Sequence, residues 1–198
     1  MSNANELKSS LRKKALARRD ALDVAQRIEL SLQAMEHGLA APEFNAGVFS
    51  VGTIVSGFLP IRSEIDTRPF MAELARRGAH LCLPVVISRT EIEFRELVRG
   101  APMEESGFGT IGPEKGSKVL IPQVMVLPLS AFDREGGRIG YGGGYYDRAI
   151  EKLAAVDQRP RLIGMAYSIQ QVDAVPMEAH DQFLDAIITE KGYLGVNR

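Results

Sequence analysis

The segment from Gly136 to Asp147, GGRIGYGGGYYD, combines residue types that suit phosphate chemistry. Six of its first nine residues are glycine. Glycine loses more backbone entropy on folding than other residues, so this density indicates a backbone that approaches a ligand closely or adopts positive φ. Successive amides there can form a nest for an anion, and Arg138 would add a planar donor for phosphate oxygens. The segment predicts a phosphate-binding loop; the alternative is a surface turn or Ω-loop.

The polar side chains of this loop allow two roles each. Tyr141, Tyr145 and Tyr146 can wall a flat organic ligand or donate their hydroxyl groups. Asp147 falls in the first turn of the helix expected to follow, where it would either cap that helix or bind Mg²⁺ beside phosphates. The loop is not a P-loop, because no Gly-Lys-Ser/Thr follows it.

A strict G-x-G-x-x-G also occurs, at Gly107, Gly109 and Gly112. A dinucleotide site needs a strand before this pattern and a helix after it. Here a polar stretch precedes it and Pro113 follows it. We therefore reject a dinucleotide site at this position.

The surrounding sequence predicts alternating strands and helices. Two helices are expected over residues 5–40, with Asp23 as the N-cap of the second. A further helix should start at Asp66 or Thr67, with Pro69 in its first turn, and end near Gly78. The other predicted segments are strands at 48–59, 80–86, 91–98, 124–132, 161–167 and 185–189, a long loop at 100–118 and a helix at 145–156. This order predicts a mostly parallel sheet with helices on both faces, and ligands bind such sheets at the carboxyl ends of the strands.

Composition excludes several classes of protein. The chain has 198 residues and a net charge of -1, which argues against a general nucleic-acid binder. Its single cysteine, Cys82, excludes a disulfide framework and a multi-cysteine zinc site, and we expect it to be a buried thiol. His180 lacks a cysteine or histidine partner at ligand spacing, so we assign it no metal role. With no membrane-length apolar run and no apolar segment behind the first charges, we expect a cytoplasmic protein without a membrane partner.

Four segments together identify a family resemblance. RIGYGGGYYDR resembles the signature of the 5-formyltetrahydrofolate cyclo-ligase family, also called methenyltetrahydrofolate synthetases. LKSSLR, FLPIRSEIDT and AHDQFLDAIITE resemble its N-terminal, substrate-binding and closing segments, in the family's order. The resemblance implies an α/β three-layer sandwich with a mostly parallel central sheet, similar to CoA-transferase and ribose-phosphate isomerase folds. It also implies one cyclo-ligase domain over residues 1–198, with the helical segment 5–40 packed on the α/β core.

The family converts 5-formyltetrahydrofolate and ATP into 5,10-methenyltetrahydrofolate, ADP and phosphate, with Mg²⁺. The resemblance implies the same reaction here: the γ-phosphoryl group is transferred to the formyl oxygen, N10 attacks the carbon, and phosphate leaves. Its implied partners are ATP and 5-formyltetrahydrofolate, which can carry a polyglutamate tail. We expect the chain to be a monomer or a weak homodimer.

The resemblance also assigns nucleotide-binding roles. Lys8 and Arg12 lie four residues apart and so share a helix face, which by itself reads as a solvated basic face. The family's Lys-x-x-x-Arg pair implies instead that both contact ATP phosphates. Arg18 and Arg19 have no such match and are expected to be surface charges. The remaining ATP-binding residues implied by the resemblance are Arg138, Ile139, Gly140, Tyr141, Gly142, Gly143, Gly144, Tyr145 and Tyr146.

Folate and metal roles follow in the same way. Glu64 reads by itself as a loop carboxylate or part of a helix cap; the resemblance implies that it binds folate, with Leu59 lining the same pocket. Tyr141, Gly142, Gly143, Gly144 and Tyr145 are also implied to face the folate. Asp147 matches one magnesium ligand. For the second we prefer Asp185 to Asp181, because it directly precedes the AIIT strand.

Two other functions stay open. A folate- or nucleotide-binding protein without turnover can use the same fold, since a fold does not fix a function. A sugar-phosphate or CoA-handling enzyme can share the architecture, although no motif here supplies the glutamate that a CoA-transferase needs. Folate-dependent release of ADP would distinguish the cyclo-ligase from the binding protein, and sugar-phosphate turnover without ATP would favour the third function.

Overall fold

The computed structural model describes residues 3–45, 49–107 and 109–197, and its centre is a seven-stranded sheet. The strand order is β11-β10-β9-β6-β1-β2-β3. The inner five strands run parallel, whereas β3 and β11 pair antiparallel with their neighbours at the two edges. The strands are β1 (Ile54–Ser56), β2 (His80–Val86), β3 (Ile92–Glu96), β6 (Val124–Leu127), β9 (Arg161–Met165), β10 (Ala186–Thr189) and β11 (Gly192–Gly195). The predicted mostly parallel sheet is confirmed.

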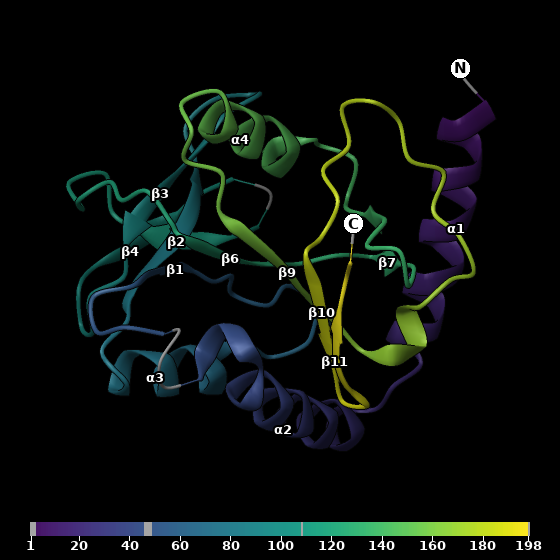
Figure 1. Ribbon diagram of the computed structural model, residues 1–198, viewed down its shortest axis with the longest axis horizontal. Coiled ribbons are helices and arrows are strands. Elements are labelled where there is room, and N and C mark those ends of the chain that lie inside the picture. Colours follow the sequence, from purple (N-terminus) through teal and green to yellow (C-terminus); the bar gives the residue numbers. More distant parts are fainter. Residues whose placement is uncertain (1–2, 46–48, 108, 198) are drawn as a thin grey trace.

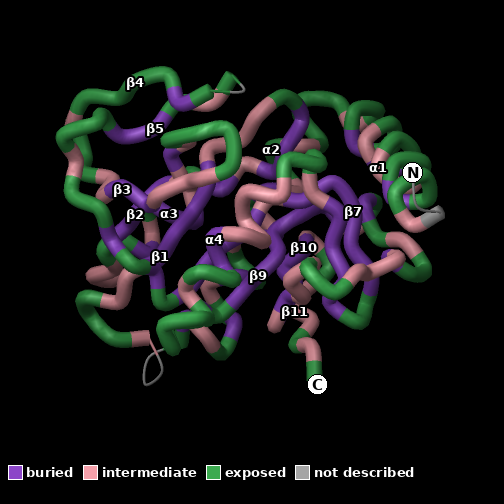
Figure 2. Tube along the Cα trace, turned by 90° about the horizontal axis from the view of Figure 1, so that it is seen from above, coloured by how far each residue is buried: buried purple, intermediate pink, exposed green. Residues whose placement is uncertain are grey.

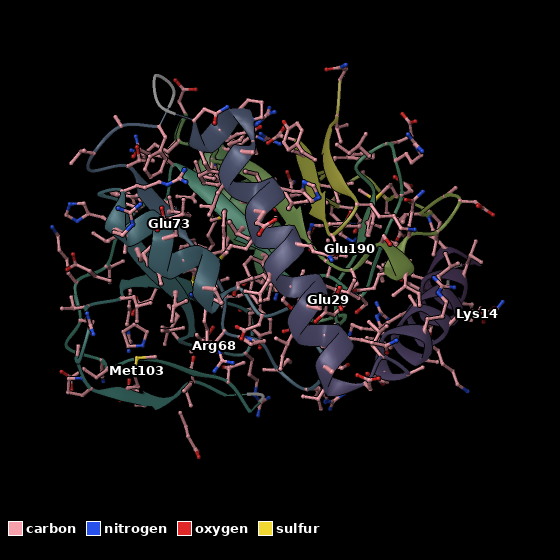
Figure 3. The ribbon with its side chains drawn as sticks, turned by 90° about the horizontal axis from the view of Figure 1, so that it is seen from below. Lys14, Glu29, Arg68, Glu73, Met103 and Glu190 are labelled. Atoms are coloured by element: carbon pink, nitrogen blue, oxygen red, sulfur yellow. The ribbon has the colours of Figure 1, made fainter. Side chains whose placement is uncertain are left out.

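Helices cover both faces of this sheet, which gives three layers (Figure 1). Helices α2 (Val24–Ala40) and α3 (Arg68–Arg76) lie on one face, and α4 (Tyr145–Ala154) lies on the other. Figure 3 shows the first face, with Glu29 on α2 and Glu73 on α3. Phe70 and Leu74 of α3 are buried in the core on that side, and Ala149 and Ile150 of α4 are buried in a second core cluster. Burial of these apolar side chains is the main favourable term holding the layers together.

Helix α1 (Asn3–Asp20) lies beside these layers rather than on either face (Figures 1 and 2). Ala15 is fully buried against a two-stranded hairpin made of β7 (Ala131–Phe132) and β8 (Arg138–Ile139). Ala131 and Ile139 supply the apolar surface of that hairpin. The hairpin follows β6, so this contact brings α1 to the segment that carries the glycine loop.

Local sequence signals explain where the helices begin. The side chain of Asp23 accepts a hydrogen bond from the Gln26 amide, and Gln26 bonds back to the Asp23 amide, which forms the capping box of α2. Thr67 is the residue before α3 and Pro69 lies in its first turn, as the sequence predicted. None of the helices in the described part of the chain is both long enough and apolar enough to cross a membrane.

Three expectations about strands and loops need correction. The predicted long loop at 100–118 contains a hairpin of β4 (Met103–Glu105) and β5 (Ile111–Pro113), and the rejected G-x-G-x-x-G lies in it with no helix after it. The strand predicted at 48–59 shrinks to β1, and Val48 lies outside the described residues. The strand predicted at 124–132 splits after β6, before Pro128, which lacks the amide proton that a central strand needs. The edge strand β11 was not predicted.

Candidate functional site

Two loops meet where the adjacent parallel strands β1 and β6 end. The loop after β1 carries Leu59 and Glu64, and the segment after β6 carries the hairpin and the glycine loop. Parallel neighbours place their carboxyl ends at the same edge of a sheet, where loops build ligand sites. The structure therefore brings the predicted folate segment and the predicted nucleotide loop together.

A hydrogen bond joins these loops directly. The hydroxyl of Tyr141 donates to Glu64 Oε1 at 2.7 Å, and the amide of Ile61 donates to Glu64 Oε2 at 2.9 Å. Glu64 is only 8% exposed. Burial raises the pKa of Glu64, while these two hydrogen bonds and the positive charges of Arg19 and Arg62 act in the opposite direction. Burial also raises the pKa of Tyr141.

The glycine loop has the backbone conformation that its composition predicted. Gly142 has φ +94° and Gly144, the residue before α4, has φ +63°, a region that favours glycine. Arg12 on α1 donates from Nε to the carbonyl of Gly140 at 2.7 Å. The loop thus lies between the first helix of the chain and the amino end of α4.

Arg138 and Asp147, on the two sides of the loop in sequence, form a partly buried ion pair. Arg138 Nη2 donates to Asp147 Oδ1 at 2.6 Å, and the amide of Gln182 donates to the same oxygen at 3.0 Å. Arg138 is buried, and its Nε has no hydrogen-bond partner among the described residues. Asp147 lies in the first turn of α4, as expected.

Lys8 lies in a cluster of acids from the C-terminal part of the chain. Its Nζ lies 2.9 Å from Glu178 Oε2 and 2.5 Å from Asp181 Oδ2. Burial lowers the pKa of Lys8, but the hydrogen bonds and charges of the two acids outweigh it and raise the pKa above its usual value. Oxygen and nitrogen atoms of Glu178, His180 and Asp181 lie within 4.8 Å of one another, so the possible ligand partners of His180 are two acids close to it in the chain.

Asp185 and Asp147 have different partners in the structure, and the preference for Asp185 as a magnesium ligand stays a prediction. Asp185 directly precedes β10, so it lies at the amino ends of the parallel strands. Its carboxylate accepts from the amide of Leu162 at 2.7 Å and pairs with Arg159 at 3.0 Å. Asp181 is the aspartate that lies beside Lys8, next to the Gln182 amide that binds Asp147.

Arg19 is buried, so the prediction that it is a surface charge is wrong. Its residue surface is 1% exposed, and its Nε donates to Ser63 Oγ at 3.0 Å. Arg18 is exposed, as expected, and donates to the carbonyls of Ile169 and Gln171. Both residues follow the same helical pattern, and only tertiary packing shows which one faces inward.

A cavity of about 470 Å³ opens beside Glu64. Leu59 and Glu64 line it, together with Ile28 of α2 and Ile111 of β5. Its basic lining residues are Arg27, Arg62 and Arg68; Figure 3 labels Arg68, at the start of α3. The cavity combines an apolar wall, the two carboxylates of Glu64 and Asp66 and three cations, which suits an organic ligand with both N–H donors and acidic groups.

Other residues of the glycine loop are placed as follows. Ile139 is buried in the small core under α1, so its side chain packs rather than faces the loop. The guanidinium carbon of Arg148 lies 5.3 Å from the ring centroid of Tyr145. Tyr146 packs against the core under α4, and burial raises its pKa. Cys82 is buried as predicted, and burial raises its pKa to about 12.

Comparisons with known proteins agree with this fold. Residues 4–190 match the model of the 5-formyltetrahydrofolate cyclo-ligase family. A 5-formyltetrahydrofolate cyclo-ligase from Mycoplasma pneumoniae is 32% identical over 93% of this chain and 99% of its own, and the one from Escherichia coli K12 is 29% identical over 87% and 94%. The solved structure of Aquifex aeolicus 5,10-methenyltetrahydrofolate synthetase superposes with a TM-score of 0.78 at 30% identity, covering 97% of this chain and 94% of that one. The chain therefore belongs to the 5-formyltetrahydrofolate cyclo-ligase family.

Proposed function

We propose that this chain converts 5-formyltetrahydrofolate to 5,10-methenyltetrahydrofolate, using ATP and Mg²⁺ and releasing ADP and phosphate. One observation carries the proposal: the hydrogen bond between Tyr141 and Glu64 joins the glycine loop to the wall of a cavity suited to an organic ligand. A phosphate-binding loop and a folate-sized pocket on adjacent strand ends suit phosphoryl transfer between two ligands. The family membership supports the same reaction.

The triphosphate would bind the cations that converge on the glycine loop. Lys8 and Arg12 approach from α1, and Arg138 approaches from β8. Lys8 and Arg138 now pair with carboxylates, so phosphate oxygens would replace the carboxylates as their partners. The positive-φ backbone at Gly142 leaves room for a phosphate close to the main chain, whereas Arg148 Nη1 occupies the corresponding space at Gly144.

The carboxylates released by this exchange fit Mg²⁺. Asp147 and Asp181 offer the oxygen ligands that this hard cation prefers. Gln182 connects them, because its amide binds Asp147 and it directly follows Asp181. We therefore propose Asp147 and Asp181, rather than Asp185, as the magnesium ligands. The bound ion would neutralise charge on the phosphates.

The folate would occupy the cavity beside Glu64. An ionised carboxylate can accept paired N–H bonds from the pterin edge, with Leu59 packing against the ring. The cations Arg27, Arg62 and Arg68 would lie near the acidic tail of the ligand. This arrangement directs the reacting end of the folate toward the glycine loop.

Positioning and charge neutralisation are then the main tasks of the protein. A formamide oxygen is a poor leaving group. Transfer of the γ-phosphoryl group to this oxygen allows it to leave as phosphate. N10 attacks the formyl carbon, the C–O bond breaks, and inorganic phosphate leaves as the ring forms. Lys8, Arg12 and Arg138 would balance the charge on the transferred group, and the loop would exclude water.

The deciding experiment measures absorbance at the methenyltetrahydrofolate band with purified protein, 5-formyltetrahydrofolate, Mg²⁺ and ATP. The proposal expects an absorbance rise that disappears when ATP is omitted. If both ligands bind and no rise occurs, the chain is a binding protein without turnover. Omitting Mg²⁺ and adding a chelator should also abolish the rise.

A further inference from the structure

Arg19 carries a buried positive charge that its surroundings satisfy only in part. Its residue surface is 1% exposed, and Nε donates to Ser63 Oγ. Its Nη1 is buried without a hydrogen-bond partner among the residues that the structure describes, and none of their carboxylates pairs with it within 4.0 Å. Burying a cation in this way costs free energy unless a further partner completes it. A ligand is the natural source of that partner.

The neighbours of Arg19 locate it at the folate site. Ser63, which accepts its hydrogen bond, directly precedes Glu64 and itself donates to Asp20. The guanidinium carbon lies 6.0 Å from the ring centroid of Tyr141, whose hydroxyl binds Glu64. A cation, a carboxylate and a phenol from three segments of the chain therefore share one small volume.

Tyr141 occupies the position that a ligand would need. Both oxygens of Glu64 accept hydrogen bonds, one of them from the Tyr141 hydroxyl. Tyr141 is 40% exposed and lies between Gly140 and Gly142, so the loop around it can change conformation more easily than the buried groups beneath. A ligand N–H that replaced the tyrosine hydroxyl at Glu64 would come next to the unpartnered nitrogen of Arg19.

We propose that Arg19 binds the substrate, its Nη1 donating to the 4-oxo oxygen of the pterin whose N–H groups bind Glu64. The pterin edge presents its 2-amino group, its N3–H and its 4-oxo oxygen in a row: two donors and then an acceptor. Glu64 satisfies only the donors, so a cationic donor next to it completes the recognition of this edge. This inference rests on the proposed function, because it takes the ligand of Glu64 to be a reduced folate.

The charges around Glu64 support this pairing. Arg19 reaches it from α1 and Arg62 from its own loop, while Tyr141 faces it from the glycine loop and Tyr146 from α4. Burial favours the protonated acid, and the two arginine charges favour the carboxylate. Arg19 would thus have two effects. Its charge would favour the ionised Glu64 that accepts the N–H groups of the substrate, and its Nη1 would donate to the 4-oxo oxygen.

The test compares two ligands by titration calorimetry without ATP. One is 5-formyltetrahydrofolate, and the other is its 2,4-diamino analogue, in which an amino donor replaces the 4-oxo acceptor and N3 no longer carries a hydrogen. The analogue alone therefore differs at Glu64 too, and the test rests on how each Arg19 variant changes the ratio of the two affinities. We expect Arg19→Met to weaken binding of the first about 10- to 100-fold, as for loss of a charge-assisted hydrogen bond. Binding of the analogue should not weaken. The ratio of the affinity for 5-formyltetrahydrofolate to that for the analogue should therefore fall at least about 10-fold. Arg18→Met is the matched control, because Arg18 is exposed on the same helix, and it should leave the ratio unchanged.

Arg19→Lys keeps the charge and provides the same measurement if the methionine variant does not fold. Its ratio should lie between those of the wild type and Arg19→Met. A folded Arg19 variant that weakens both ligands equally would make Arg19 a structural residue and overturn the inference. A wild-type protein that binds neither ligand would instead remove the proposed function itself.

Discussion

Lys8 Nζ lies 2.5 Å from Asp181 Oδ2, although 173 positions separate the two residues. The first helix of the chain is therefore tied to its C-terminal part at the point where both meet the glycine loop. Arg12, one helical turn after Lys8, bonds to that loop at Gly140. Neither end of the chain forms this site alone.

Lys8→Met should weaken the binding of ATP more than the binding of folate. The change removes a cation proposed to bind phosphate and leaves the like charges of Glu178 and Asp181 without the lysine that lies between them. We expect the KM for ATP to rise roughly 10-fold or more, as for loss of a hydrogen bond to a charged group. Lys13→Met, on an exposed position of the same helix, should change neither KM. An equal rise in both KM values would contradict the assignment.

The same pair should stabilise the fold in a pH-dependent way. The pKa of Lys8 is raised above 10.5 in the folded protein. The stabilisation is therefore complete below 10.5 and is lost as the pH rises through the folded pKa. Denaturant unfolding of wild type and Lys8→Met should show a stability difference that shrinks in that alkaline range. A difference that stays constant there would mean that the ion pair contributes nothing.

The aspartates near the C-terminus should separate into a metal ligand and a structural residue. Asp181→Asn should increase the Mg²⁺ concentration needed for half-maximal activity, as should Asp147→Asn. Asp185→Asn should leave the Mg²⁺ titration unchanged and lower the free energy of unfolding by about 1 kcal/mol, because it weakens the bonds to Arg159 and the Leu162 amide. A shifted Mg²⁺ titration in Asp185→Asn alone would restore the original preference for Asp185.

Gly142→Ala should test the backbone conformation of the loop. At φ +94° an L side chain is strained although its Cβ would have room, the nearest atom being Arg12 Nη2 at 3.7 Å. We expect a raised KM for ATP and a stability loss of about 1 kcal/mol. Gly100→Ala is the matched control, since Gly100 has φ +81° with open space around it, outside the site. It should lose similar stability and keep its KM, and an equal KM change in both variants would remove the loop from nucleotide binding.

Glu64→Gln should weaken folate binding and remove the fall in folate affinity at acidic pH. Folate binding uses the ionised form, and burial raises the pKa of Glu64 above 4.5, so wild-type affinity should fall as the pH drops through that raised value. The glutamine variant should bind roughly 10- to 100-fold more weakly at neutral pH, with no such fall. Affinity measured by calorimetry across mildly acidic pH checks this, and ATP affinity should stay unchanged. For the fold the sign is opposite: stability falls as pH rises from 4.5 through the folded pKa, because the folded state holds this proton more tightly.

Sequence patterns alone indicated the sheet and the glycine loop, and the family resemblance indicated the candidate site residues. Alternation of strands and helices is a local property, and so are the cap at Asp23 and the glycine density before α4. These features depend on residues close in the chain, where spacing reports structure directly. The hairpin at 103–113 was missed because its two three-residue strands are too short for alternation to show.

Only the tertiary structure decided which charged residues face the site. Arg18 and Arg19 are adjacent on one helix, and their burial depends on what packs against that helix. Asp181 and Asp185 lie four residues apart, and an extended chain of that length carries one to Lys8 and the other to the opposite ends of the strands. The sequence determined the chemistry available to this protein through local patterns. Which of two neighbouring residues of the same type lies at the candidate site depends on the fold, because it is set by contacts between segments far apart in the chain.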